Sequence, residues 1–255
     1  MHYHDVKNGN DVLVSQPIRV DLNNDVLREI LSHADIQSVF QLCLVNKTLC
    51  HQYDDIFRRI YQRLYHHTGM SVFKTTDITW FQLLKLCYKL SRLHILLPSL
   101  KKYTIKSLYT MTELDLSNIK IKVLPPEMGQ LSSLQTLDLS YNELSTLPQE
   151  MGQLHSLQSL DLSYNKLSAL PPEMGQLSAL QQLYLFHNQL SSLPPEMVQL
   201  GDLQSLNLSN NQLSTLPPEM GQLRSLQVLF LLKNNFSSIF IKKLKQQLLN
   251  TKIYL

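Results

Sequence analysis

The sequence predicts an α/β solenoid, in which short parallel strands form a curved sheet with an exposed concave face, preceded by an all-α helical domain. The first observation is self-similarity, because the segment Leu131–Gln153 recurs with a period of 23 residues. A fixed period of this size is typical of stacked repeat architectures. The second observation is that Leu137 and Leu139 alternate with polar residues, which indicates a strand with one buried face. The third is helical spacing of apolar residues ahead of the repeats.

The repeats occupy residues 108–236 in this interpretation. The close copies are Leu131–Gln153, Leu154–Gln176, Leu177–Gln199 and Leu200–Gln222, with a weaker copy at Leu108–Gln130 and a broken one from Leu223. The other apolar residues of the second copy are expected to point inward as well: Leu131, Leu134, Leu144, Leu147 and Met151. One coil cannot bury such a set alone, whereas stacked coils can. Pro148 has no N–H group and a fixed φ, so it suits the start of the convex segment.

One asparagine recurs at every period: Asn142, Asn165, Asn188, Asn211 and Asn234. A tight turn leaves buried backbone groups that need hydrogen-bond partners. An asparagine amide both donates and accepts, so we expect Asn142 to connect its own turn to the next coil. Loss of this side chain is expected to cost about 1–3 kcal/mol.

The pattern L-x-x-L-x-L-x-x-N-x-L-x-x-L-P-x-x-M resembles that of the leucine-rich repeat family, over about half of the chain. The resemblance implies a right-handed arc with a parallel concave sheet. Residues 237–255 are expected to form a capping helix, because Phe240, Leu244 and Leu248 share one helical face. Terminal repeats are often atypical, and the end of such a core must be covered. A basic membrane-binding helix is the alternative for this segment.

Composition limits the classes of function. The chain has 255 residues, 44% hydrophobic and 17% charged, as in globular proteins. No apolar run reaches the length of a membrane span, and the start lacks the apolar core of a secretory signal. Three cysteines, all outside the repeats, favour free thiols in a reducing compartment. We therefore expect an intracellular, cytoplasmic protein.

The charge distribution disfavours nucleic acid as a partner of the repeats. Residues 108–236 carry 5 Lys and Arg against 11 Asp and Glu, a net charge of −6. Phosphate binding needs clustered positive charge. The segment from Ser237 onward differs, since it carries four lysines and no acidic residue.

Three segments precede the repeats. Residues 1–19 are polar and are expected to be a flexible lead-in. Residues 20–60 predict three short helices, and residues 61–107 predict a helical linker that also caps the first coil. Three short helices bury little surface alone, so such a unit depends on a neighbour or a partner.

The order of residues in the segment 20–60 resembles an F-box. The matching positions are Leu22, Leu27, Ile30, Leu31, Asp35, Val45 and Lys47. Two departures are Asn23, where the family has Pro, and Ala34, where it has Leu. The resemblance implies docking onto the Skp-type adaptor of a cullin–RING ubiquitin ligase through Leu22, Leu27, Ile30, Leu31 and Val45. The alternative is that these helices only cap the solenoid.

Residues that face outward from the strands are free to vary, and they are candidates for binding a partner protein on the concave face. The candidates are Asp115, Asp138, Tyr141, Asp161, Tyr164, Tyr184, Phe186, His187, Asn207, Phe230 and Leu232. Exposed aromatic residues beside polar ones are typical of binding hot spots. The aspartates favour a basic segment of the partner. The alternatives are repeat drift and burial of Phe230 and Leu232 under the carboxyl-terminal cap.

The two resemblances together imply a substrate-recognition adaptor of an SCF-type ubiquitin ligase, whose repeats bind an unknown target protein. No phosphate-binding loop, Gly-rich loop or nucleophile with a positioned base is present, so we expect no enzyme activity, no cofactor and no metal site. The alternative is a non-catalytic intracellular leucine-rich repeat scaffold with a helical cap. Short chains of this kind also resemble effectors that intracellular bacteria deliver into host cells, which implies the host cytosol as the location in that case.

Overall fold

The structure is a computed structural model that describes residues 58, 62, 97, 99–100 and 103–255. All of these residues belong to the unit Phe57–Leu255 of the chain. The lead-in, the helices expected over residues 20–60 and most of the linker expected over residues 61–107 lie outside the described residues.

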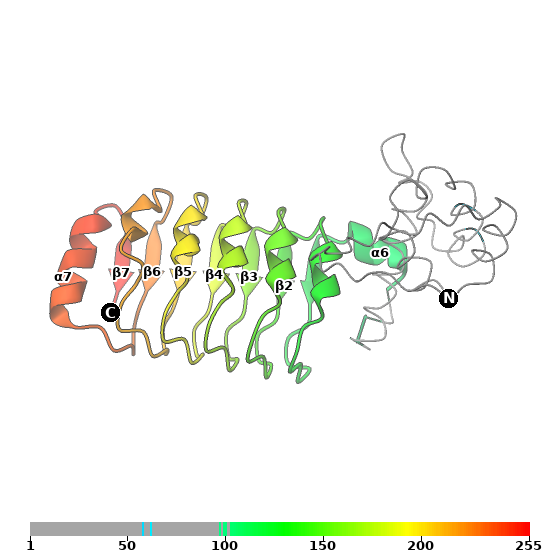
Figure 1. Ribbon diagram of the computed structural model, residues 1–255, viewed down its shortest axis with the longest axis horizontal. Helices are drawn as coiled ribbons and strands as arrows, with labels where there is room; N and C mark the ends of the chain where they lie inside the picture. Colours follow the sequence, from blue (N-terminus) through cyan, green and yellow to red (C-terminus); the bar gives the residue numbers. More distant parts are fainter. Residues whose placement is uncertain (1–57, 59–61, 63–96, 98, 101–102) are drawn as a thin grey trace, which may run out of the picture. The chain divides into compact units, whose positions relative to one another are not determined.

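The described part is a solenoid in which each of the coils that begin with β1 to β5 contributes one short strand and one 3-10 helix (Figure 1). After helix α6 (Ile105–Thr110), the strands are β1 (Glu113–Asp115), β2 (Thr136–Asp138), β3 (Ser159–Asp161), β4 (Gln182–Tyr184), β5 (Ser205–Asn207), β6 (Val228–Phe230) and β7 (Lys252–Tyr254). The 3-10 helices are η4 (Pro126–Gln130), η5 (Gln149–Gln153), η6 (Pro172–Gln176), η7 (Pro195–Gln199) and η8 (Met220–Gln222), and helix α7 (Ser238–Gln247) follows β6. The strands pair in chain order, and all six pairings are parallel.

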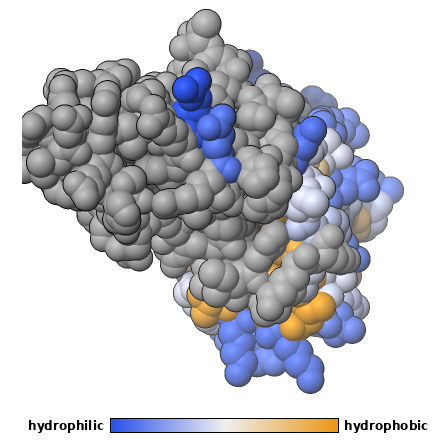
Figure 2. Space-filling model, turned by 90° about the vertical axis from the view of Figure 1, so that its right-hand side faces the viewer, coloured by the Kyte–Doolittle hydropathy of each residue, from blue (hydrophilic) through white to orange (hydrophobic). Residues whose placement is uncertain are grey.

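The core consists of leucine columns that repeat from coil to coil. Leu137 of β2 is in register with Leu114 and Leu160 of the neighbouring strands, and all three are buried. The residues predicted to point inward from the rest of the second coil are also buried, which confirms that prediction. Each fully buried leucine contributes about 1.5–3 kcal/mol. Where described residues are visible in Figure 2, most are hydrophilic, with hydrophobic patches among them.

The recurring asparagine bonds to the preceding coil, not to the next one as the sequence analysis expected. Asn165 donates through Nδ2 to the carbonyl of Leu139 at 2.9 Å, and its Oδ1 accepts from the N–H of Leu144 at 3.0 Å. It also donates to the carbonyl of Leu162 in its own turn at 3.1 Å. Asn142, Asn188, Asn211 and Asn234 repeat this arrangement. The direction follows from the path of the coil, which brings the buried turn beside groups 21 to 26 residues earlier.

On the convex side the coils approach so closely that glycine is required. A Cβ placed on Gly152 of η5 would overlap the carbonyl oxygen of Glu173 in the next coil. The corresponding residue in η7 is Val198, and the following helix η8 is shortened to Met220–Gln222. The coil with valine in place of glycine is thus followed by the shorter helix. Pro148 lies at the N-cap of η5 with φ −69°, in agreement with its predicted place.

The carboxyl-terminal segment contains a strand in addition to the predicted helix. Ser237 caps α7 by accepting a hydrogen bond from the N–H of Phe240, and Leu244 is buried. Helix α7 continues the row of short convex helices, with Gln247 donating to the carbonyl of Pro218 at 3.0 Å (Figure 1). The chain then returns as β7, which pairs with β6. The strand was missed because its register partners are 24 residues apart, as in Val228 and Lys252, so it falls outside the 23-residue period.

We predict that Asn188→Ala lowers the free energy of unfolding by about 1–3 kcal/mol, because it leaves buried backbone groups of two coils without partners. These groups are the N–H of Leu167 and the carbonyls of Leu162 and Leu185. Urea denaturation followed by circular dichroism measures the change. Gln189→Ala alters the exposed neighbouring residue and serves as the control. Equal stability of the two variants would contradict the structural role of the amide.

We predict that Gly152→Ala lowers the free energy of unfolding by about 1–3 kcal/mol, because two adjacent coils must move apart. Gly201→Ala is the matched control, since nothing lies within 4 Å of the added Cβ. Its stability is expected to stay equal or to rise by about 0.4–1 kcal/mol through a smaller unfolded-state entropy. Thermal unfolding of the two variants measures both changes in stability. An undiminished melting temperature for Gly152→Ala would contradict the predicted clash between adjacent coils.

Candidate partner-binding face

The outward face of the sheet carries a row of acidic residues at one end of the stack. Asp115, Asp138 and Asp161 end strands β1, β2 and β3 and are partners in the parallel register. They face outward because the leucines on either side of each aspartate are buried. In each case Oδ1 accepts a hydrogen bond of 2.8 Å from the serine N–H two residues later. We call these three residues the aspartate row.

The aspartate row places like charges on neighbouring strands. Adjacent strands lie about 4.8 Å apart, and like charges directly opposite each other on a sheet are destabilising. In the next coils the row continues as Tyr184, Asn207 and Phe230. Asn207 makes the same turn bond, at 3.1 Å to the N–H of Ser209. An uncharged amide therefore makes the same turn bond at a longer distance, so the turn can form without the negative charge.

Three ring systems stack in the turns that follow β2, β3 and β4. Tyr141 and Tyr164 lie with ring centroids 4.3 Å apart and an interplanar angle of 11°, and Tyr164 and His187 follow at 4.4 Å and 10°. Phe186 packs its ring edge to face against Tyr164 at 5.2 Å. We call Tyr141, Tyr164, His187 and Phe186 the aromatic ladder. Tyr141 is 55% exposed, so the ladder presents aromatic surface to solvent at its first rung.

The stacked residues have an unfavourable backbone conformation for their type. Tyr141, Tyr164 and His187 have φ values of 55°, 52° and 54°, in the left-handed region. Bulky side chains are uncommon there, whereas asparagine is enriched. Asn118, Asn210 and Lys233 occupy the equivalent turns of the other coils, so the left-handed turn itself belongs to the repeat. Backbone strain of this kind costs about 1–3 kcal/mol and concentrates at functional sites.

Asp161 contributes to the environment of the Tyr141 hydroxyl. The pKa of the Tyr141 hydroxyl lies above its usual value. The first cause is partial loss of hydration, followed by a hydrogen bond to Tyr164 and by negative charge on Tyr164 and Asp161. Because Asp161 contributes, the tyrosine hydroxyl and the carboxylate act within one local field.

The remaining residues predicted from the sequence fall into two groups, those on the repeats and those of the F-box segment. The Tyr184 hydroxyl donates to Oε1 of Gln182 at 3.0 Å. Phe230 stacks on Tyr254 of β7 with centroids 4.6 Å apart, while Leu232 is 39% exposed. The predicted docking residues Leu22, Leu27, Ile30, Leu31 and Val45 lie outside the described residues.

Two residues of β7 extend this face and were not among the sequence candidates. Tyr254 covers the Phe230 ring, and Nζ of Lys252 lies 4.9 Å from the centroid of Tyr254. The alternation of polar and apolar residues in Lys252-Ile253-Tyr254 is a signal that could have found the strand. The face thus changes along the stack, from acidic at β1–β3 to aromatic and basic at β6–β7.

The described residues contain no group of three or more side chains that could hold a metal ion. Within the same part of the chain, no helix has both the length and the apolar composition that crossing a membrane requires. The chemical resources of the face are carboxylates, amides, hydroxyl groups and aromatic rings, which are suited to binding a protein surface.

A solenoid with an open sheet face is typical of proteins that act through protein–protein interaction. The family comparisons agree with this fold. Residues 109–167 match the family model described as leucine rich repeat, and residues 149–250 match the one described as leucine-rich repeat region. Residues 20–52 match the F-box domain. The chain therefore belongs to the leucine-rich repeat proteins and carries an F-box domain ahead of its repeats.

A solved structure supports the fold, and a second one is similar in sequence. A leucine-rich repeat protein from Leptospira interrogans is 41% identical, with a TM-score of 0.57, over 60% of this chain and 40% of that protein. The leucine-rich repeat ectodomain of a plant membrane receptor kinase from Arabidopsis thaliana, in complex with CASPARIAN STRIP INTEGRITY FACTOR 2, is 40% identical. That match covers 49% of this chain and 16% of the receptor chain, with a TM-score of 0.46. No curated protein matches the chain.

We predict that Asp138→Asn/Asp161→Asn raises the free energy of unfolding by about 0.2–1 kcal/mol, because it removes like charges from adjacent strands. The turn bonds are expected to persist, as they do at Asn207. Thermal denaturation at low salt measures the gain. The gain should disappear at about 1 M salt, where screening acts within about 3 Å. A loss of stability at low salt would show that the charges support the fold.

Proposed function

We propose that this protein is a substrate-recognition adaptor of an SCF-type ubiquitin ligase. The F-box docks on the Skp-type adaptor, and the repeats bind a target protein on the outward face of the sheet. The observation that carries this proposal is the order of modules in one chain, with the F-box match at residues 20–52 and the repeat matches at residues 109–250. A docking module joined to a recognition module is the arrangement that such an adaptor needs.

The aromatic ladder supports the recognition half of the proposal. The chain places Tyr141, Tyr164 and His187 in left-handed turns where Asn118 and Asn210 show that asparagine also fits. Aromatic residues in these turns add strain and exposed apolar surface without being needed for the coil. Exposed, rigid aromatic side chains are the residue types that dominate binding energies at protein interfaces.

The mechanism we propose is proximity. Binding the target and the ligase through one chain converts their encounter into an intramolecular one and raises the effective concentration of the target. In this proposal no side chain of the protein makes or breaks a covalent bond, and the protein acts by binding alone.

The docking half is tested by measuring binding of the purified chain to a purified Skp-type adaptor. Leu27→Asp/Ile30→Asp is expected to abolish binding, because charged side chains replace aliphatic ones that the F-box resemblance places at the contact. Leu27→Met/Ile30→Val keeps the apolar character and is expected to retain binding. Isothermal titration calorimetry measures both.

A matched variant separates the two halves. Tyr141→Asn/Tyr164→Asn changes the ladder and should leave adaptor binding unaltered. Circular dichroism checks that the repeats stay folded in every variant. If the wild-type chain does not bind the adaptor, the proposal fails and a non-catalytic repeat scaffold takes its place.

A further inference from the structure

The composition of the outward sheet face next to the aspartate row indicates what kind of target it fits. The face combines Asp138 and Asp161, on neighbouring strands, with Tyr141 and Tyr164 in the turns that follow them. For each of these aspartates the structure gives one hydrogen-bond partner, a serine N–H that bonds to Oδ1. Within the part of the chain that the structure describes, the second carboxylate oxygen of each accepts no hydrogen bond, so it can accept one from a bound partner.

Lysine neighbours within the repeats do not neutralise these two aspartates. Lys166 forms its ion pair with Oε2 of Glu143 at 3.0 Å. Lys120 and Lys122 act on Glu143 as well, and with Lys166 they hold the pKa of its carboxyl below the usual value, with the hydrogen bond to Lys166 as the first cause. The positive charges of this region thus gather around Glu143.

The geometry favours a planar cation. Two carboxylates on adjacent strands lie roughly 5 Å apart, a spacing that the fork of N–H groups on one guanidinium can bridge. The ladder stacks one face of the Tyr141 ring on Tyr164, and the residue as a whole remains 55% exposed. Guanidinium groups stack on aromatic faces, whereas an ammonium is a compact and strongly hydrated charge.

We propose that this face binds a basic, arginine-bearing segment of the target protein, with guanidinium groups on Asp138 and Asp161 and against the ring of Tyr141. An apolar segment fits worse, because it would remove the carboxylates from water without partners. The proposal rests on the proposed function, since the segment belongs to the recognised target. It also explains why the chain keeps aspartates where Asn207 serves the turn without charge.

The test uses the full chain and a fluorescein-labelled peptide of alternating arginine and glycine, with matched lysine and glutamate peptides. Fluorescence anisotropy gives the affinities. The arginine peptide is expected to bind, the lysine peptide to bind more weakly and the glutamate peptide not to bind. Affinity for the arginine peptide should fall with added salt.

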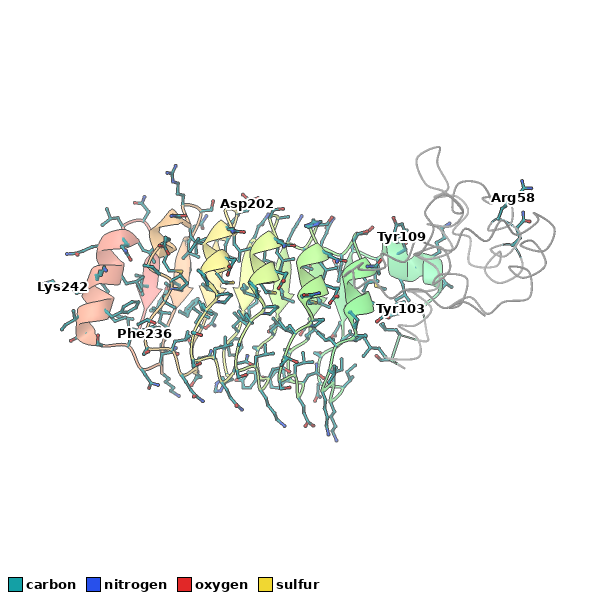
Figure 3. All side chains as sticks on the ribbon, viewed as in Figure 1. Arg58, Tyr103, Tyr109, Asp202, Phe236 and Lys242 are labelled. Carbon is teal, nitrogen blue, oxygen red and sulfur yellow. The ribbon has the colours of Figure 1, made fainter. Side chains whose placement is uncertain are left out.

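Three double variants locate the contact. Asp138→Asn/Asp161→Asn keeps the turn bonds and is expected to weaken arginine-peptide binding about fivefold. Tyr141→Asn/Tyr164→Asn is expected to weaken it by a similar factor. Asp202→Asn/Glu219→Gln removes the same charge from exposed residues outside the aspartate row and should leave affinity unchanged (Asp202 is labelled in Figure 3).

Several results would overturn the inference. One is equal weakening by Asp202→Asn/Glu219→Gln, which would show a net-charge effect only. Another is equal binding of the lysine and arginine peptides, and a third is no binding of the arginine peptide. The basic helix α7, from which Lys242 points away from the stack in Figure 3, offers a second copy of the chain as the rival occupant. Oligomers in light scattering that Asp138→Asn/Asp161→Asn breaks apart would support that rival.

Failure of this inference and failure of the proposed function give different results. Leu27→Asp/Ile30→Asp should lose the Skp-type adaptor and keep the arginine peptide. Loss of peptide binding with adaptor binding intact would reject the arginine segment alone. Peptide binding without adaptor binding by the wild-type chain would reject the ligase role and leave the basic-segment face standing.

Discussion

The buried asparagine amide is the interaction on which the stack of coils depends. Each coil makes a tight turn whose backbone groups are enclosed by leucines and cannot reach water. Asn165 satisfies such groups in its own turn and in the coil before it. Because each amide binds two coils at once, the coils hold a fixed register. The strands then pair in chain order, and the close convex approach at Gly152 follows from the same spacing.

This framework separates residues that build the fold from residues that are free to vary. Leucine columns, the asparagine and the convex proline and glycine are set by packing. The outward positions between the leucines carry no such demand, so coils of one backbone display aspartate, tyrosine, asparagine or phenylalanine at the same site. A rigid backbone also holds the aromatic ladder in place, which lowers the entropy that a partner must offset on binding.

The folding of the repeats does not by itself explain why aspartates occupy neighbouring strands. Neighbouring aspartates weaken a parallel sheet, and an asparagine serves the same turn. The carboxylate oxygens of Asp138 and Asp161 cap their own turns, but the bond at Asn207 shows that the negative charge is not needed for that. In the proposed function the same charges gain a partner only when a target segment arrives, so electrostatic strain in the free protein favours complex formation.

The sequence by itself determined the repeat period, the buried leucines, the place of the prolines and the capping helix, because these depend on periodicity and on local backbone chemistry. It also identified Tyr141, Tyr164 and His187 as outward residues. Only the tertiary structure decided that these rings stack, that their turns are left-handed, and that the asparagine reaches back to the preceding coil. Strand β7 likewise became evident only from the tertiary structure. Its 24-residue offset from β6 departs from the 23-residue period, yet it pairs in parallel with β6 as the last strand of the sheet. Contacts between coils depend on the handedness and rise of the superhelix, which residue spacing does not specify.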